Sequence, residues 1–300
     1  MMLDGKSAGP SSTSFELTPP AVAKPQVQCG VQRELISVIV TTYDRPDALN
    51  AVLRGLAGQT DRRFEVIVAD DGSDRRTAQL LEAWSASFAR LAHAWHEHRN
   101  FRAAEIRNRA ILQSFGELCI FLDGDCIPRP DFIRVHRRLA EPGWFVAGNR
   151  VLLSRQLTAR ILAEQLEPEQ WSLRQWAGAR LKGEINRLQP LLSLPLGPLR
   201  RVGSAAWRSI RSANLAVARP DLLRVDGFDA AFSGWGREDS DIVLRLMHGG
   251  TRRKDGRFAS AVLHLWHPES DRSRLAANDI LLDDVLRHRR IKAQIGLSSL

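Results

Sequence analysis

Two short apolar runs decide the fold class of this chain. Residues 36–42 have the sequence I-S-V-I-V-T-T, and residues 64–70 have the sequence F-E-V-I-V-A-D. Both are rich in β-branched residues and bounded by turn residues, which predicts strands buried on both faces. Between them, residues 46–58 begin with proline and end with glycine, as helices often do. A strand, a helix and a second strand in this order indicate a parallel βαβ unit.

The same alternation continues along the chain. We predict further helices over 74–90 and 102–115, a weak strand over 91–97 and a strand over 117–123. This pattern predicts an α/β fold with a Rossmann-like, doubly wound, mostly parallel sheet and helices on both faces. After about residue 150 the rhythm breaks, and we expect regular structure again over 212–218 (strand), 238–248 (helix), 258–263 (strand) and 272–291 (surface helix).

Composition bounds the function without choosing it. The chain has 300 residues, 44% of them hydrophobic and 26% charged, which is typical of a globular protein. Its 43 Lys+Arg against 34 Asp+Glu give a net charge of +9, nearly all of it from arginine. Arginine suits bidentate binding of phosphate and carboxylate, so the surplus indicates an anionic partner: a nucleotide, a nucleic acid or an anionic membrane.

The cysteines and the apolar runs indicate a compartment. Cys29, Cys119 and Cys126 are odd in number and lack a C-x-x-C spacing, which disfavours a disulfide framework or a zinc site. No stretch reaches the roughly 18 apolar residues that a membrane span needs, and the N-terminus lacks a signal-peptide pattern. We therefore expect a cytoplasmic protein.

Acidic residues follow two of the predicted strands. Asp70 and Asp71 end one strand, and Asp123-Gly124-Asp125 ends another. Ligands bind at the carboxyl ends of strands in such sheets, and two carboxylates one residue apart can hold a divalent cation beside a diphosphate. An isolated D-x-D is more often a loop with solvated acids, but its position here favours a metal site. The first pair fits a base- or ribose-binding carboxylate and an ordinary turn equally well.

Three further segments carry candidate chemistry. Arg102 and Arg107, near the start of a predicted helix, fit either pyrophosphate binding or a solvated helix face. Residues 234–241, G-W-G-R-E-D-S-D, present an indole between glycines, followed by acids that could cap a helix or act as a general base. His264 and His267 follow an apolar run and are candidate metal ligands.

Together these motifs resemble inverting glycosyltransferases of family two, which have the GT-A fold, with a galactosyltransferase-like C-terminal region. The matching stretches are S-V-I-V-T-T-Y-D-R (37–45), V-I-V-A-D-D-G-S (66–73), R-N-R-A (107–110), F-L-D-G-D (121–125), G-W-G-R-E-D-S-D (234–241) and H-L-W-H-P (264–268). The resemblance implies a nucleotide-sugar donor, most often a UDP-sugar, and Mn²⁺ or Mg²⁺ as cofactor.

The resemblance also implies roles for individual residues. Around the uridine it puts Thr41, Tyr43, Asp44 and Asp70, and near the diphosphate or the metal-side acids it puts Arg107. Asp123 contacts the ribose or the metal, Asp125 ligates the ion, and His264 completes the site with His267 as the competing candidate. On the acceptor side, Trp235 and Gly236 lie against a sugar, Asp239 is the general base, and Glu238 binds acceptor hydroxyls.

The expected organisation follows the same resemblance. We predict an N-terminal tail over 1–33, a nucleotide-sugar-binding half over 34–150, a basic helical insert over 151–210, an acceptor-binding and catalytic half over 211–270, and a C-terminal helix over 271–300. Trp171, Trp176 and Trp207 in the insert suit either an anionic membrane surface or burial under a helical subdomain.

The predicted activity is inverting transfer of a hexose or N-acetylhexosamine from a UDP-sugar to a glycan or glycolipid, such as a bacterial surface polysaccharide intermediate. Peripheral contact with the cytoplasmic face of an anionic inner membrane is expected, and nucleic-acid binding is not, because stacking motifs are absent. Two alternatives stay open: a catalytically silent GT-A scaffold, which the intact acids disfavour, and a nucleotidyltransferase, which usually has a Gly-rich basic loop where this chain has T-T-Y-D-R-P.

Overall fold

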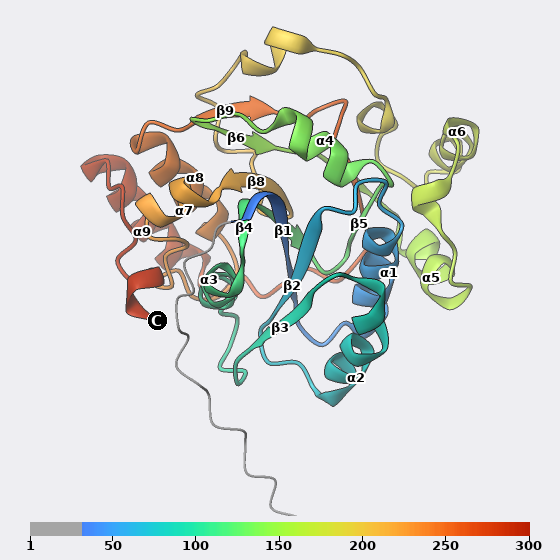
Figure 1. Cartoon of the computed structure of the whole chain (residues 1–300), viewed down its shortest axis with the longest axis horizontal. Coiled ribbons are helices and arrows are strands. Elements are labelled where there is room, and N and C mark those ends of the chain that lie inside the picture. The colour runs from blue at the N-terminus through green and yellow to red at the C-terminus, as the bar shows by residue number, and fades with distance from the viewer. Residues whose placement is uncertain (1–31) are drawn as a thin grey trace, which may run out of the picture.

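Seven strands form the central sheet, in the order β3-β2-β1-β4-β8-β6-β9 (Figure 1). The computed structural model describes residues 32–300. The strands are β1 (Gln32–Thr42), β2 (Phe64–Asp70), β3 (Leu91–Trp95), β4 (Gly116–Asp123), β6 (Trp144–Ala147), β8 (Asn214–Ala218) and β9 (Arg252–Asp255). β3, β2, β1 and β4 run parallel, whereas β8 is antiparallel to both β4 and β6. The predicted mostly parallel α/β sheet is confirmed.

Alternate residues of the strands enter two separate cores. Val38 and Val40 of β1 pack with α1 (Pro46–Ala57) and α4 (Phe132–Leu139), whereas Ile39 packs with α3 (Ala103–Gln113), α7 (Arg219–Arg224) and α8 (Glu238–His248). α2 (Arg75–Trp84), which η1 (Ser85–Ser87) follows, lies on the α1 side. Figure 1 shows the two groups of helices on opposite sides of the sheet. The β-branched runs form strands because both of their faces are buried.

A second sheet, of three short strands, lies next to the D-G-D turn. It contains β5 (Cys126–Pro128), β10 (Val262–His264) and β7 (Arg150–Leu152), with β10 antiparallel to β5 and parallel to β7. The register pairs His264 with Cys126, next to the D-G-D turn. The strand expected over 258–263 is wrong for residues 258–261, because the chain turns there and Ser260 N–H donates to Gly256 O.

The segment between β7 and β8 contains short helices. They are α5 (Arg155–Ala163), η2 (Pro168–Gln170), α6 (Leu173–Leu181), η3 (Gln189–Leu191) and η4 (Gly197–Arg201). Trp176 is buried, and the rings of Trp171 and Trp176 lie 4.9 Å apart. Trp207 is partly buried and lies under the Arg208 guanidinium. Of the two interpretations of these indoles, the structure therefore favours burial for Trp176, with Trp171 half-buried against it.

The two ends of the chain depart from the expected boundaries. β1 begins at Gln32, so the last two residues of the expected 1–33 tail belong to the sheet, and residues 1–31 lie outside the described residues. α9 (Leu275–His288) packs on α8 through Leu282 and Val285, so it is not only a surface helix. After α9 the chain folds back beside α7 and ends in η5 (Leu297–Ser299). Among residues 32–300, no helix combines the length and apolarity of a membrane span.

Candidate active site

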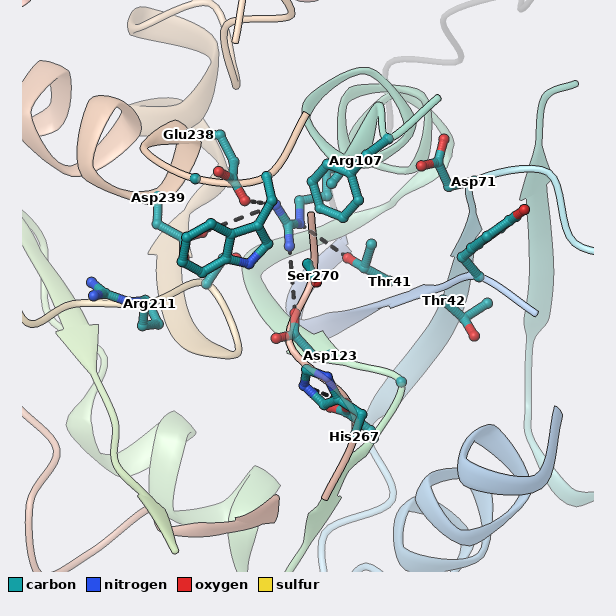
Figure 2. Close-up of a pocket in the computed structure, with 18 of the residues that line it drawn as sticks. Thr41, Thr42, Asp71, Arg107, Asp123, Arg211, Glu238, Asp239, His267 and Ser270 are labelled. Carbon is teal, nitrogen blue, oxygen red and sulfur yellow. Dashed lines mark hydrogen bonds and ion pairs between the residues drawn. The ribbon is translucent and has the colours of Figure 1, made fainter. Parts of the chain in front are cut away.

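A cavity of about 590 Å³ opens at the carboxyl ends of β1 and β4. Its lining includes eleven of the sequence-predicted site residues: Thr41, Tyr43, Arg107, Asp123, Asp125, Trp235, Gly236, Glu238, Asp239, His264 and His267. These residues come from both halves of the chain, and Figure 2 shows several of them turned toward one another. Asp44 and Asp70 are not in the lining.

The D-G-D turn lies directly against β1. Gly124 N–H donates to Thr41 O at 2.7 Å. A Cβ atom on Gly124 would come within 2.9 Å of Thr41 O and 3.0 Å of Thr42 Cβ, so a larger residue would force the two segments apart. Glycine at this position therefore lets Asp123 and Asp125 stand at the edge of the cavity.

Arg107 of α3 connects the two acidic motifs. Its Nε donates to Thr41 Oγ1 at 3.0 Å and its Nη2 to Asp123 Oδ1 at 3.4 Å, while Nη1 lies 3.6 Å from Glu238 Oε1 and 4.0 Å from Asp239 Oδ1 (Figure 2). The side chain is buried, and Nη1 has no hydrogen-bond partner among the described residues. The guanidinium therefore lies between Asp123 of the D-G-D turn and the two acids at the start of α8.

The acids at the start of α8 differ in environment. Burial raises the pKa of Glu238 to about 7, and the neighbouring Asp239 adds to the effect while Arg107 opposes it. Asp239 Oδ1 is buried without a hydrogen-bond partner among residues 32–300. Asp241 is held by Arg245 at 2.6 Å, and both side chains are fully buried. Of the three acids, Glu238 and Asp239 face the cavity and Asp241 is structural.

The carboxylate of Asp125 lies between two imidazoles. His264 Nε2 is 3.4 Å from Asp125 Oδ1, and His267 Nε2 is 3.5 Å from Asp125 Oδ2. His267 Nδ1 lies 2.7 Å from the carbonyl of Pro268, which can only accept, so Nδ1 is the donor and Nε2 is the ring nitrogen that faces Asp125. Oxygen and imidazole donors together suit a divalent metal such as Mn²⁺. The residues present therefore fit the expected ion.

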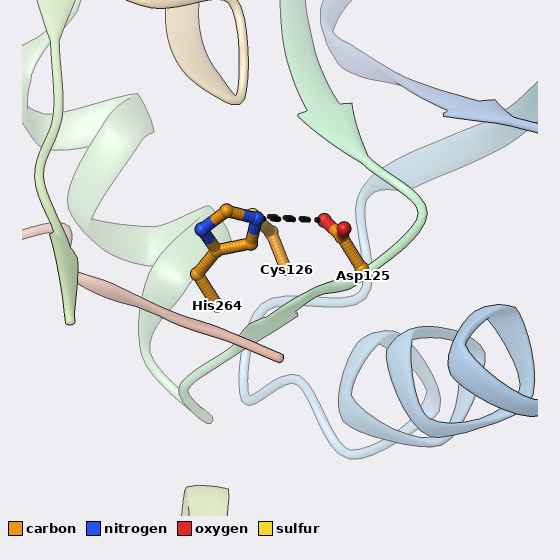
Figure 3. Close-up of side chains that lie close together, drawn as sticks. All are labelled: Asp125, Cys126 and His264. Atoms are coloured by element: carbon orange, nitrogen blue, oxygen red, sulfur yellow. Dashed lines mark hydrogen bonds and ion pairs between the residues drawn. The ribbon is translucent and has the colours of Figure 1, made fainter. Parts of the chain in front are cut away.

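Cys126 lies beside Asp125 and His264 (Figure 3). Its sulfur, a carboxylate oxygen of Asp125 and a ring nitrogen of His264 all lie within 4.8 Å of one another. Burial raises the pKa of its thiol well above the ordinary value, and the charges of Asp125 and Asp123 raise it further. The thiol donates to Asp125 Oδ1 at 3.6 Å. Without a metal ion, Cys126 therefore acts as a hydrogen-bond donor to Asp125.

On the β2 side, Asp71 occupies the cavity wall in place of Asp70. Asp70 is fully buried, accepts from Ser73 N–H at 2.8 Å and lies 2.9 Å from His93 Nε2. Asp71 lines the cavity and accepts from Arg102 N–H at 2.9 Å. β2 ends at Asp70, and Asp71 is the first residue of the loop that follows, so only Asp71 lies beyond the buried end of the strand at the cavity.

Two other residues expected near the base have different surroundings. Tyr43 lines the cavity, and its ring stacks on His98 at 4.2 Å. Asp44 instead joins two loops, because its Oδ1 accepts from Asp74 N–H at 3.0 Å and its own N–H donates to Ser73 Oγ at 2.9 Å. Asp44 thus holds the β1–α1 loop in position without lining the cavity.

The Gly-Trp-Gly loop is shaped by glycine and held by α9. Gly234 and Gly236 have φ values of +75° and +106°, which side chains rarely adopt. Asn278 of α9 donates to Gly236 O at 2.8 Å, and Arg272 lies over the Trp235 ring at 5.3 Å. The indole is therefore presented to the cavity on a fixed loop.

Sequence reasoning missed several residues of the lining, among them Arg150, Arg211, Ser212 and Ser270. Arg211 and Ser212 lie just before β8, which is antiparallel to β4, so the start of β8 meets the end of β4. Rules for parallel sheets do not predict a ligand site at the start of a strand. Asp71 was visible in the sequence as the second acid of D-D-G-S (70–73), but the nucleoside contact was assigned to Asp70.

A family model matches the part of the chain that contains both acidic strand ends, Asp70-Asp71 and Asp123-Gly124-Asp125. The model of glycosyl transferase family 2 matches residues 37–189, about half of the chain. This chain belongs to glycosyltransferase family 2. A second model, described as the N-terminal domain of galactosyltransferase, matches residues 204–267, which include G-W-G-R-E-D-S-D and both histidines. The predicted family and its galactosyltransferase-like C-terminal region are thereby confirmed.

Relatives of this family 2 chain include validoxylamine A glucosyltransferase of Streptomyces hygroscopicus subsp. jinggangensis. The two are 28% identical over 228 residues, covering 72% of this chain and 52% of the relative. The chain thus spans about half the length of this curated relative. The match supports a transferase, as the family does.

Two solved structures share the GT-A fold of this family 2 chain. The mannosyltransferase PcManGT from Pyrobaculum calidifontis, in complex with GDP-Man and Mn²⁺, has a TM-score of 0.57 at 19% identity and covers 84% of this chain and 64% of its own. S. aureus TarS 1-349, in complex with UDP-GlcNAc, has a TM-score of 0.56 at 16% identity, with coverages of 82% and 65%. At these identities the likeness establishes the fold.

Proposed function

We propose that this family 2 chain is an inverting glycosyltransferase that moves a hexose or N-acetylhexosamine from a UDP-sugar to a hydroxyl of a glycan or glycolipid. The strongest support is the position of Arg107, buried between Asp123 of one motif and Glu238 and Asp239 of the other. Donor-side and acceptor-side acids thus share one cavity, as a transfer between two bound substrates requires.

The proposed chemistry is a single displacement. Asp239 takes the proton of the acceptor hydroxyl, and the oxygen forms a bond to the anomeric carbon. The bond from that carbon to the donor phosphate oxygen breaks on the opposite face, and its electron pair leaves with UDP. Attack and departure on opposite faces invert the anomeric centre.

The chain's own residues stabilise the charges in this step. Asp123, Asp125, His264 and His267 would hold the divalent cation, preferably Mn²⁺, and when bound the cation neutralises charge on the leaving diphosphate. Arg107 places its Nη2 beside Asp123 and its Nη1 beside Glu238 and Asp239, so its positive charge lies between the donor side and the acceptor side of the cavity. Glu238, whose pKa is about 7, can donate a hydrogen bond to an acceptor hydroxyl while it is protonated.

We assign the substrate-binding surfaces by their chemistry. Thr41, Tyr43 and Asp71 would contact the nucleoside, and Trp235 with Gly236 would lie against a sugar ring. Asp44 and Asp70 would support the nucleoside pocket indirectly, through the loop contacts described above. The choice of UDP follows the family resemblance; TarS binds UDP-GlcNAc and PcManGT binds GDP-Man, so the experiment must compare both nucleotides.

Release of nucleoside diphosphate from a donor panel tests this proposal. The full chain with Mn²⁺ would be incubated with UDP-glucose, UDP-galactose, UDP-N-acetylglucosamine and GDP-mannose, each with glycan and glycolipid fractions as acceptors. We expect release from at least one UDP-sugar, abolished by EDTA. Preferential consumption of GDP-mannose, or release that EDTA leaves unchanged, would refute the donor and metal assignments respectively.

A further inference from the structure

A second cavity, of about 670 Å³, lies beside the edge strand β9 and shares no lining residue with the active-site cavity. Four cationic side chains line it: Arg138, Arg200, Arg201 and Lys254. The rest of the lining is mainly apolar. Most of it comes from the connection that contains η4, drawn in yellow along the top of Figure 1, and Leu139 of α4 and Phe258 complete it. The pocket thus combines positive charge with an apolar rim.

Arg200 is the buried cation of this pocket. Its guanidinium donates only to main-chain carbonyls, those of Asp255 at 2.9 Å, Arg257 at 2.6 Å and Leu194 at 2.9 Å. Carbonyl acceptors hold the group in place without neutralising it. Among residues 32–300, no carboxylate lies within ion-pair distance of Arg200.

The other cations are only partly balanced. Lys254 Nζ and Arg201 Nη2 share one carboxylate, that of Glu141, at 2.5 Å and 2.7 Å. Arg138 is exposed and forms no ion pair within the described part of the chain. The Asp255 carboxylate also acts on Arg200, but it is paired with Arg253 and Arg257. The pocket therefore keeps an excess of positive charge, which an anionic group entering it would offset.

The rim beside this charge exposes apolar side chains. Leu194 is 43% exposed, Leu199 66% and Val202 69%. The segment is fixed to the sheet edge, because Leu194 N–H donates to Phe258 O at 2.9 Å and Arg253 Nη1 to Gly203 O at 3.4 Å. Exposed aliphatic side chains next to arginines are the composition of surfaces that enter the headgroup region of anionic bilayers.

We infer that this face docks on an anionic lipid bilayer, with a lipid phosphate in the pocket of Arg138, Arg200, Arg201 and Lys254 and with Leu194, Leu199 and Val202 inserted among the headgroups. The arrangement moves the membrane contact away from Trp176, which the fold buries, and from Trp171, which is half-buried against it. The same segment continues to Arg211 and Ser212 of the active-site cavity. If the proposed function holds, docking would bring a membrane-borne acceptor close to that cavity.

Vesicle sedimentation tests this inference without nucleotide, metal or acceptor, so its outcome is independent of the proposed transfer. The full chain would be mixed with vesicles of phosphatidylcholine alone and of phosphatidylcholine with phosphatidylglycerol. We expect binding to the anionic vesicles only, weakened by added salt. The variant Arg138→Glu/Leu199→Asp should bind at least about tenfold more weakly, because it removes both attractive contributions.

A matched control makes the same chemical changes elsewhere. Arg174→Glu/Ile280→Asp alters an exposed arginine of α6 and the 72% exposed Ile280 of α9, and it should bind as the unmodified chain does. Thermal unfolding checks that each variant folds. If the variant Arg138→Glu/Leu199→Asp does not fold, the single variant Arg138→Glu is measured in its place. Equal binding by both double variants, or no binding by the unmodified chain, would overturn the inference. So would an increase in Tm with inorganic phosphate in the absence of vesicle binding.

Discussion

Arg107 is the residue on which the electrostatics of the site depend. Burial alone would lower the pKa of its guanidinium, but Asp239, Asp123 and Glu238 outweigh burial and raise it. For Asp123, burial raises the pKa of the carboxyl group. The charge of Asp125 raises it further, and the charge of Arg107 opposes the rise. A permanently charged arginine among these acids keeps two acidic motifs from repelling each other in one small volume.

At the same scale, Asp239→Asn tests the base. We expect transfer to fall by about 10²-fold or more, because the amide cannot take the hydroxyl proton, while the Kd for UDP stays unchanged. UDP release and UDP titration measure the two quantities. Asp283→Asn on the exposed face of α9 is the control and should change neither. Near-normal turnover would move the base to Glu238, since Asp241 is occupied by Arg245.

Glu238→Gln tests the raised pKa of Glu238. In the unfolded chain Glu238 loses its proton near pH 4.5, but in the folded chain it keeps the proton to about pH 7. The folded state therefore binds more protons in this window, and its stability from this group, fully present below pH 4.5, is lost as the pH rises through about 7.

The expected result is a change in relative stability with pH. Measured by urea unfolding in EDTA, the free energy of unfolding of Glu238→Gln relative to the unmodified chain should rise by about 1–3 kcal/mol from pH 5 to pH 8. Glu164→Gln, an exposed change on the surface, should give a flat difference. A flat difference for Glu238→Gln as well would show that its pKa is not raised.

At the scale of elements, β10 and the loop after it bring His264 and His267 to Asp125. The His264 side chain is 13% exposed and that of His267 is 36% exposed, so water competes less at His264. We expect His264→Ala to weaken Mn²⁺ binding more than His267→Ala does, in a calorimetric titration without nucleotide. The opposite order would assign His267 as the stronger ligand.

Asn108 connects α3 to the loop that leads toward the Gly-Trp-Gly segment. Its side chain donates to Phe228 O and accepts from Phe228 N–H, both at 2.8 Å, and it is buried. Asn108→Ala leaves two buried main-chain groups unpaired, so we expect unfolding free energy to fall by about 2–4 kcal/mol. Asn186→Ala, at an exposed site that accepts one main-chain N–H, should cost less. Equal losses would contradict this role for Asn108.

Elements with strong periodic patterns were predictable, and short polar ones were not. β2 and α8 have the predicted bounds, because an apolar run and an acid-rich helix start are local signals. β9 has the sequence R-R-K-D and no apolar signal, so its pairing with β6 depends on the sheet already present. α2 ends at Trp84, before the predicted end at residue 90, because the chain continues as the 3₁₀ helix η1 (Ser85–Ser87).

For the whole molecule, the parallel half was predictable and the meeting of the two halves was not. The order of motifs indicates which strand ends carry acids, but only the antiparallel insertion of β8 beside β4 brings Arg211 and Ser212 to the D-G-D turn. Likewise, Asn278 reaches the Gly-Trp-Gly loop because α9 folds back onto α8. Such contacts join segments far apart in the chain, which no local pattern encodes.

Under the proposed function, the active-site cavity binds UDP together with a divalent cation. Calorimetric titration of UDP into the full chain, with Mn²⁺ and then with EDTA, tests it most directly, with GDP and CDP as controls. We predict UDP-selective binding that requires Mn²⁺ and that Asp125→Ala abolishes. Binding of GDP in preference to UDP, UDP binding that persists in EDTA, or no nucleotide binding under any condition would contradict the account.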